Sequence, residues 1–87
     1  FLHNGKYPCY SIYQTKDKKF IALAAIEEKY WSEFSNCFGL HLTPEDRFNY
    51  SEKIFNIISN KISSYTQDEI IVKTKSSNFC LSIIYDK

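Results

Sequence analysis

The sequence predicts a small α+β domain, with an antiparallel β-hairpin, two to three helices and a C-terminal strand that returns to the hairpin. Three observations predict it. Two segments rich in β-branched and aromatic residues flank a short charged turn near the start, apolar residues recur at helical spacing through the middle, and a last β-rich segment lies near the end. With 87 residues, the chain forms one domain with one modest core.

The hairpin comes first. The segment CYSIYQT (Cys9 to Thr15) is rich in aromatic and β-branched residues and lies between Pro8 and the charged stretch KDKK, which predicts a strand entering a turn. The segment KFIALAAI (Lys19 to Ile26) is its predicted partner. Because this second strand hardly alternates between apolar and polar residues, we expect it to be covered on both faces.

A helix is predicted from Glu27, because apolar residues then recur every three to four positions. Its apolar stripe consists of Tyr30, Phe34 and Phe38, with Trp31 and Cys37 beside them. Gly39 is well placed to end this helix in a left-handed conformation. The following loop, His41 to Phe48, contains Thr43 and Pro44, which suit the start of a short helical turn.

The last elements are two further helices and a strand. A helix over about residues 49–63 would bury Ile54, Ile58 and Ile62, with Phe55 and Ile57 widening that face. The stretch TQDE (Thr66 to Glu69) is a capping-box pattern and predicts the start of a short third helix. The segment FCLSIIY (Phe79 to Tyr85) is predicted to be the returning strand.

Composition excludes several classes of function. Eleven Lys and Arg residues nearly balance ten Asp and Glu residues without a block of one charge, so neither nucleic acid nor an acidic membrane surface is an expected partner. No apolar run reaches the roughly 18 residues of a membrane span, and no signal peptide is evident, so we expect a cytoplasmic protein. The chain contains no methionine, so we expect it to be a piece of a longer chain.

The sequence offers no complete catalytic constellation. Cys9, Cys37 and Cys80 are far apart and lack close partners, which favours free thiols over disulfides or a metal site. His3 and His41 lie in predicted loops, and two glycines cannot form a Gly-rich phosphate loop, so no cofactor is expected. Glu27 and Glu28 remain, at the start of a helix, where the helix dipole alone would account for two carboxylates.

Much of the chain nevertheless resembles one known family. Pro8, Tyr10 and Tyr13, followed by Thr15 and Asp17, stand in the order found at the start of the small domain of the CaiB/BaiF family, which comprises the family III CoA-transferases and α-methylacyl-CoA racemase. The stretches AAIE (24–27), SSYTQDEI (63–70) and NFCLSII (78–84) resemble later parts of the same domain. The chain departs from the family pattern at Lys18, which replaces a turn glycine, at Ile70, which replaces tryptophan, and at Ile83, which replaces proline.

This resemblance implies that residues 1–87 are a single small domain whose Rossmann-like large domain is absent, so that the chain is inactive alone. The parent protein would act on acyl-CoA and form an interlocked homodimer. Tyr10, Tyr13 and Trp31 are our candidates for the contact with the large domain, and the alternative is that they belong to the core of this domain. The stretch AIE favours the racemase branch, in which a glutamate at the position of Glu27 pairs with a catalytic histidine. CoA transfer between carboxylic acids, or a non-catalytic interaction module from a split or decayed gene, are the alternatives.

Overall fold

The computed structural model describes residues 7–49, 51–77 and 80–84 and contains three strands, three α-helices and one 3₁₀ helix. In chain order these are β1 (Tyr10–Gln14), β2 (Phe20–Ala24), α1 (Glu28–Cys37), η1 (Pro44–Phe48), α2 (Glu52–Ile62), α3 (Gln67–Lys73) and β3 (Cys80–Ile84). Each predicted element is present and is slightly shorter than its apolar pattern. The predicted ends of the last strand, Phe79 and Tyr85, lie outside the described residues, as do His3 and the side chain of Cys80.

The three strands form one antiparallel sheet in the order β1-β2-β3. In the register, Tyr13 pairs with Ile21 in the hairpin, and Phe20 at the start of β2 pairs with Ile84 at the end of β3. The last strand of the chain therefore returns to the hairpin and places β2 in the centre, which confirms the predicted α+β fold.

The turn between β1 and β2 is held by a cluster of polar groups. Thr15 Oγ1 donates to Asp17 Oδ1 (2.5 Å) and accepts from the Lys19 amide (3.0 Å). Lys18 adopts a left-handed backbone conformation with φ of 67°, which costs a residue with a Cβ about 1–2 kcal/mol. The turn glycine of the family pattern would avoid that cost at this position.

The helix ends follow the capping signals in the sequence. Gly39 has φ of 67°, and the amides of Gly39 and Leu40 donate to the carbonyls of Asn36 (3.2 Å) and Ser35 (2.8 Å), which is a Schellman motif. At α3, Thr66 Oγ1 accepts from the Glu69 amide (3.1 Å) while Glu69 Oε1 accepts from the Thr66 amide (2.8 Å). This is the predicted capping box.

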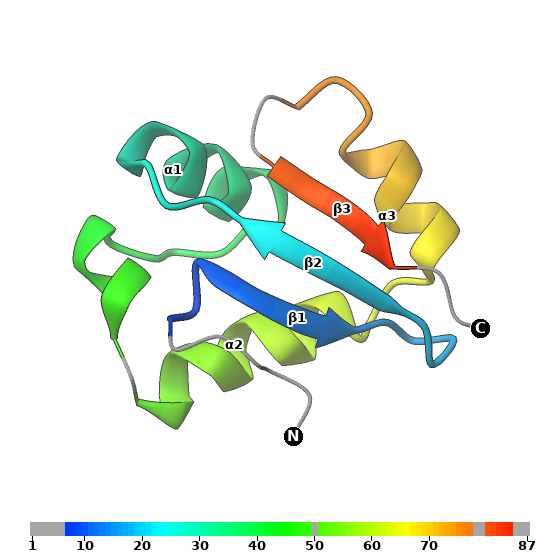
Figure 1. The fold of residues 1–87 in the computed structure, drawn as a ribbon, viewed down its shortest axis with the longest axis horizontal. Helices are drawn as coiled ribbons and strands as arrows, with labels where there is room; N and C mark the ends of the chain where they lie inside the picture. The colour runs from blue at the N-terminus through cyan, green and yellow to red at the C-terminus, as the bar shows by residue number, and fades with distance from the viewer. Residues whose placement is uncertain (1–6, 50, 78–79, 85–87) are drawn as a thin grey trace.

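All three α-helices lie on one face of the sheet, so the molecule has two layers and measures 33 × 30 × 18 Å (Figure 1). The apolar residues between the layers come from the covered face of the sheet and from the inner sides of the helices. They are Cys9, Tyr13, Ile21, Leu23, Ala25, Trp31, Phe34, Phe38, Leu40, Ile54, Phe55, Ile58, Ile62 and Ile70. Burial of this set supplies the main driving force for folding.

Two sequence expectations about burial are wrong. Strand β2 is covered on one face only: Ile21 and Leu23 are buried, whereas Phe20, Ala22 and Ala24 are half-buried on the face without helices. Alanine is apolar but small, so it gives no indication of which face of a strand is covered. Of the three aromatic residues expected at a contact surface, Tyr13 and Trp31 are core residues with 1% and 0% exposure, and Tyr10 alone is exposed.

A buried glutamine, Gln67, joins α3 to the ends of two neighbouring strands, β2 and β3. Its Nε2 donates to the carbonyls of Phe20 (3.0 Å) and Ile84 (3.3 Å), and its backbone amide donates to Asp17 Oδ1 (3.1 Å). One residue thus connects the hairpin turn, the start of β2, the end of β3 and the start of α3. In the sequence, this stretch shows only the pattern of a helix cap.

Candidate functional site at the junction of β2 and α1

The junction between β2 and α1, residues 25–28, presents the carboxylate that the sequence singled out. Glu27 is the N-cap residue of α1, with extended backbone angles (φ −73°, ψ 142°), and its side chain is exposed and makes no capping hydrogen bond. Most N-cap side chains accept a hydrogen bond from the first turn of their helix. The Glu27 carboxylate is therefore an exposed group that takes no part in capping α1.

The backbone of Glu27 is held although its side chain is not. Its carbonyl accepts from the amides of Tyr30 (3.1 Å) and Trp31 (2.9 Å) in the first turn of α1. On the other side, the carbonyl of Ile26 accepts from Nη1 of Arg47 (2.7 Å), a residue of η1. The backbone of the junction is therefore held by hydrogen bonds, whereas the side chains of residues 26–28 are exposed.

Glu28, the neighbouring carboxylate, occupies the first turn of α1 and is also exposed. A negative charge at this position is favoured by the positive end of the helix dipole. Exposure alone therefore does not distinguish the two glutamates. What distinguishes them is position, since Glu27 precedes the helix and Glu28 belongs to it.

Exposed apolar side chains surround the junction. Tyr10 is 58% exposed, Ile26 50% and Phe48 44%, and their grouping at one end is more informative than the exposure of any one of them. They come together because Tyr7 pairs with Tyr10 and also contacts Phe48 edge-on, with ring centroids 5.2 Å apart. Figure 1 shows the start of β1, the end of β2, η1 and the start of α1 at this same end of the molecule. The carboxylate of Glu27 thus lies at an end of the domain that is rich in exposed apolar groups.

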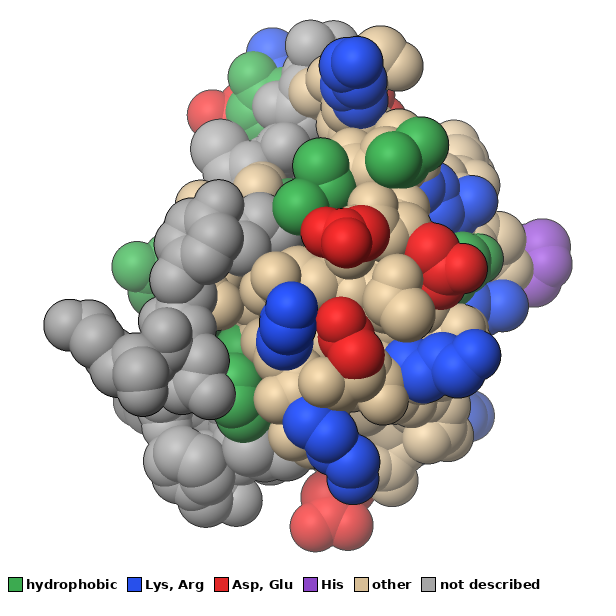
Figure 2. Space-filling model, turned by 90° about the vertical axis from the view of Figure 1, so that its right-hand side faces the viewer, with side chains coloured by type: hydrophobic (Ala, Val, Ile, Leu, Met, Phe, Trp, Pro, Cys, Tyr) green, Lys and Arg blue, Asp and Glu red, His purple; other side chains and the backbone are tan. Residues whose placement is uncertain are grey.

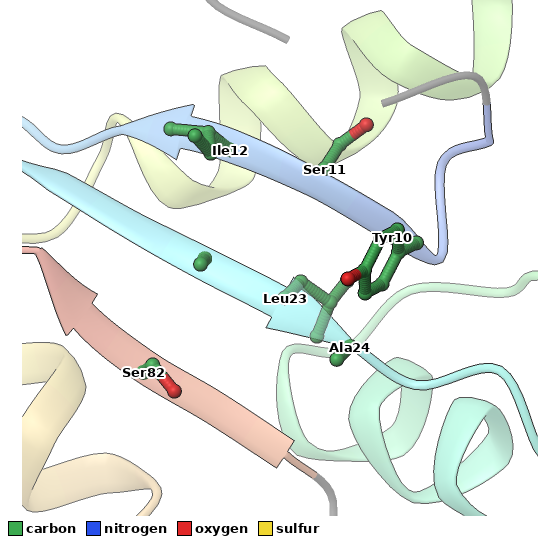
Figure 3. A pocket seen from close by; sticks show the side chains of 7 residues that line it. Tyr10, Ser11, Ile12, Leu23, Ala24 and Ser82 are labelled. Atoms are coloured by element: carbon green, nitrogen blue, oxygen red, sulfur yellow. The ribbon is translucent and has the colours of Figure 1, made fainter. Parts of the chain in front are cut away.

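The open face of the sheet carries a shallow hollow of about 380 Å³. The residues that line it are Tyr10, Ser11, Ile12, Ala22, Leu23, Ala24 and Ser82. Small side chains on β2 and β3 form its floor, and the ring of Tyr10 stands over the end of β2 near Ala24 (Figure 3). Its lining contains no carboxylate, histidine or lysine, so the hollow is suited to packing or apolar binding and not to proton transfer.

Three titratable groups near the sheet have shifted pKa values. Burial raises the pKa of the Cys9 thiol, and burial together with the nearby Cys9 raises that of the Tyr13 hydroxyl, which donates to the Pro8 carbonyl (2.7 Å). The hydrogen bond from Thr15 is the main cause of the lowered pKa of Asp17. Each of these groups has a structural role, because each bonds or packs within the fold.

The remaining sequence candidates do not add to this site. His41 is exposed in the loop after α1, and Cys9 and Cys37 are free thiols. Among residues 7–49, 51–77 and 80–84, no group of three or more His, Cys, Asp or Glu side chains could hold a metal ion. No helix formed by these residues combines the length and apolar character needed to cross a membrane.

Charges are mixed on the face of the molecule that carries α3 (Figure 2). Figure 2 shows the face that carries α3, on which lysine side chains alternate with carboxylates and no large area has one sign. Ile71 and Val72 of α3 are also exposed. Among its described residues, this face therefore lacks the continuous basic stripe that binding to nucleic acid requires (Figure 2).

Sequence reasoning missed Arg47, which is the only arginine of the chain. Its Nε donates to the Pro44 carbonyl (2.8 Å) and its guanidinium lies 4.9 Å from the centroid of the Phe48 ring, in addition to its bond to Ile26. The one signal available was an arginine in the last turn of a short helix that begins at Pro44. That pattern does not reveal a contact with a residue 21 positions earlier.

Comparison with known proteins agrees with this architecture. The family model described as CoA-transferase family III matches residues 2–86. A CaiB/baiF CoA-transferase family protein of Caenorhabditis elegans is 30% identical over 86 residues, which are 98% of this chain and 24% of the relative. The chain thus spans about a quarter of the length of that relative. The match extends over both the hairpin and the returning strand, and the chain therefore belongs to CoA-transferase family III.

Proposed function

We propose that this domain completes the acyl-CoA site of a longer family III protein, and that the site catalyses the removal and return of the α-proton of a 2-methylacyl-CoA. The observation that carries the proposal is the exposed carboxylate of Glu27 on a fixed backbone at the N-cap of α1, just after β2. A carboxylate that accepts the N–H of a histidine fixes the tautomer of the ring and raises its basicity. Glu27 would act in this way on a histidine of the large domain.

The residues that resemble the family pattern divide into two groups in the structure. Tyr13, Thr15 and Asp17 are engaged within the domain, in the core and in the hairpin turn. Tyr10 and Glu27 are exposed at the same end of the molecule. This division supports a contact between that end and another part of the protein, because residues used only for the fold would be buried or bonded internally.

We also propose that this end and the open sheet face pack against a large domain in an interlocked homodimer. Exposed apolar groups around the junction support such a contact. Because Tyr13 and Trp31 are already buried in the domain, Tyr10 alone can report on it. Its ring should lose solvent accessibility in the intact dimer relative to the isolated chain, and an equally accessible Tyr10 in both would contradict the contact.

The test of the main proposal is α-proton exchange from a 2-methylacyl-CoA in D₂O, catalysed by the intact protein. Glu27→Gln keeps the shape of the side chain and removes its charge, and loss of a charge-assisted hydrogen bond is expected to lower turnover about tenfold to hundredfold. Glu28→Gln is the matched control and should leave turnover unchanged. Equal rates for the two variants would return Glu27 to a purely electrostatic role at the helix terminus.

CoA transfer between carboxylic acids is the second candidate, favoured by the names of the matching family and of the worm relative. It is tested by supplying an acyl-CoA and a free carboxylate and measuring the new thioester. Transfer without α-proton exchange would favour this candidate. The isolated chain is expected to show neither activity, because the structure brings no nucleophile and base together among its described residues.

A further inference from the structure

We infer that Arg47 is a positioning residue that fixes the backbone of Glu27 and so the direction in which its side chain leaves the chain, a role that rests on the function proposed for Glu27. Arg47 lies in η1, which is well beyond Glu27 along the chain. Its guanidinium reaches back to the peptide that precedes Glu27 through the bond from Nη1 to the Ile26 carbonyl (2.7 Å).

This contact restricts the backbone of Glu27 because peptide units are planar. The carbonyl of Ile26 and the amide of Glu27 belong to one rigid plane, and the carbonyl of Glu27 belongs to the next. Arg47 holds the first plane, and the amides of Tyr30 and Trp31 hold the second. The only soft backbone torsions between the two planes are φ and ψ of Glu27, so fixing both planes fixes the direction of its Cα–Cβ bond, at φ −73° and ψ 142°.

Arg47 is itself anchored, as a positioning residue must be. Its Nε donates to the Pro44 carbonyl (2.8 Å), and its guanidinium packs on Phe48. The segment η1 is in turn tied to α1, because Trp31 Nε1 donates to the Thr43 carbonyl (2.9 Å). A planar guanidinium can serve the carbonyls of Pro44 and Ile26 together through two rigidly related donors, whereas a lysine presents a single point charge.

The experiment uses the intact protein with Arg47→Ala and Arg47→Lys, each alone and combined with Glu27→Gln. Two quantities are measured: hydrogen–deuterium exchange of the backbone over residues 25–31, and kcat and KM for α-proton exchange from a 2-methylacyl-CoA. Lys73→Ala is the control, because Lys73 also packs on aromatic rings, 5.7 Å from the centroid of Phe38 and 5.4 Å from that of Tyr65, but on α3.

If Arg47 acts through Glu27, Arg47→Ala should speed backbone exchange at the junction and lower kcat about tenfold, with KM nearly unchanged. The same substitution should change kcat less than about twofold when it is added to Glu27→Gln, because coupled residues have non-additive effects. Arg47→Lys should have an intermediate effect and keeps the test decisive where Arg47→Ala does not fold. The Lys73 control should match the unmodified protein.

Unchanged backbone exchange at residues 25–31 would overturn the inference. So would a loss of kcat on Arg47→Ala that is equally large with and without the Glu27→Gln substitution. Different results would show that the proposed function itself is wrong. Full activity of Glu27→Gln, or no α-proton exchange by the unmodified protein, would overturn the role of Glu27. Backbone exchange would then still decide whether Arg47 holds the junction.

Discussion

Gln67→Met tests how the side chain of Gln67 attaches α3 to the sheet. Methionine matches glutamine in length and nearly in volume, but it cannot donate a hydrogen bond. The substitution removes both bonds from Nε2, to the carbonyls of Phe20 and Ile84, and keeps the bond from the backbone amide of residue 67 to Asp17. The substitution therefore tests only the side-chain hydrogen bonds between α3 and the ends of β2 and β3.

The expected magnitude follows from these contacts. Each neutral hydrogen bond contributes about 0.5–1.5 kcal/mol, so two bonds amount to about 1–3 kcal/mol. Gln67 is 5% exposed, so water cannot readily replace the lost donor, and we expect about 2 kcal/mol. For a domain of this size, that corresponds to a fall in Tm of about 8–16 °C.

The assay is thermal and urea unfolding of the 87-residue chain, followed by circular dichroism. Gln14→Met is the matched control, because Gln14 is a half-buried glutamine on the open sheet face. Its free energy of unfolding should change by less than about 0.5 kcal/mol. Equal stabilities for the two variants would refute the view that the Gln67 side chain stabilises the contact of α3 with the ends of β2 and β3.

Three further predictions concern the turn, the core and the loop after α1. Lys18→Gly should raise the free energy of unfolding by up to about 1 kcal/mol, because φ of 67° suits glycine; a lower urea midpoint would contradict this. Burial raises the pKa of Tyr13, so its neutral form stabilises the fold fully below the unfolded pKa of about 10 and progressively less as pH rises above it. Tyr13→Phe should therefore lose less stability between about pH 9 and about pH 11 than the unmodified chain, and parallel losses would exclude Tyr13 as a cause. Trp31→Phe removes the donor to the Thr43 carbonyl and should speed backbone hydrogen exchange over residues 42–48, whereas unchanged exchange there would show that this bond does not hold η1.

The local signals in the sequence were sufficient for the kinds of element and for the ends that carry a cap. Gly39 was predicted to end α1, and Thr66 with Glu69 to start α3, because each signal needs only residues within one helical turn. The predicted hairpin and returning strand are also present. Periodicity and capping are properties of neighbouring residues, so the chain carries them without reference to its tertiary structure.

The choice between the two faces of the sheet was not available from the sequence. Tyr10 and Tyr13 are an odd number of positions apart and so lie on opposite faces of β1, but both are aromatic, and the sequence could not tell which face the helices cover. The alanines of β2 gave no further help, since they are equally compatible with a covered or an open face. The helices decided it by all packing on the side of Tyr13 and Leu23.

By itself, the sequence determined the kind and order of the elements, the family resemblance and the position of Glu27 at the start of a helix. Only the tertiary structure decided what holds that position. The bond from Arg47 to Ile26 spans 21 residues and that from Gln67 to Phe20 spans 47. Long polar side chains have no periodic pattern, and whether they meet a particular backbone carbonyl depends on how the elements pack, so such contacts exist only once the chain has folded.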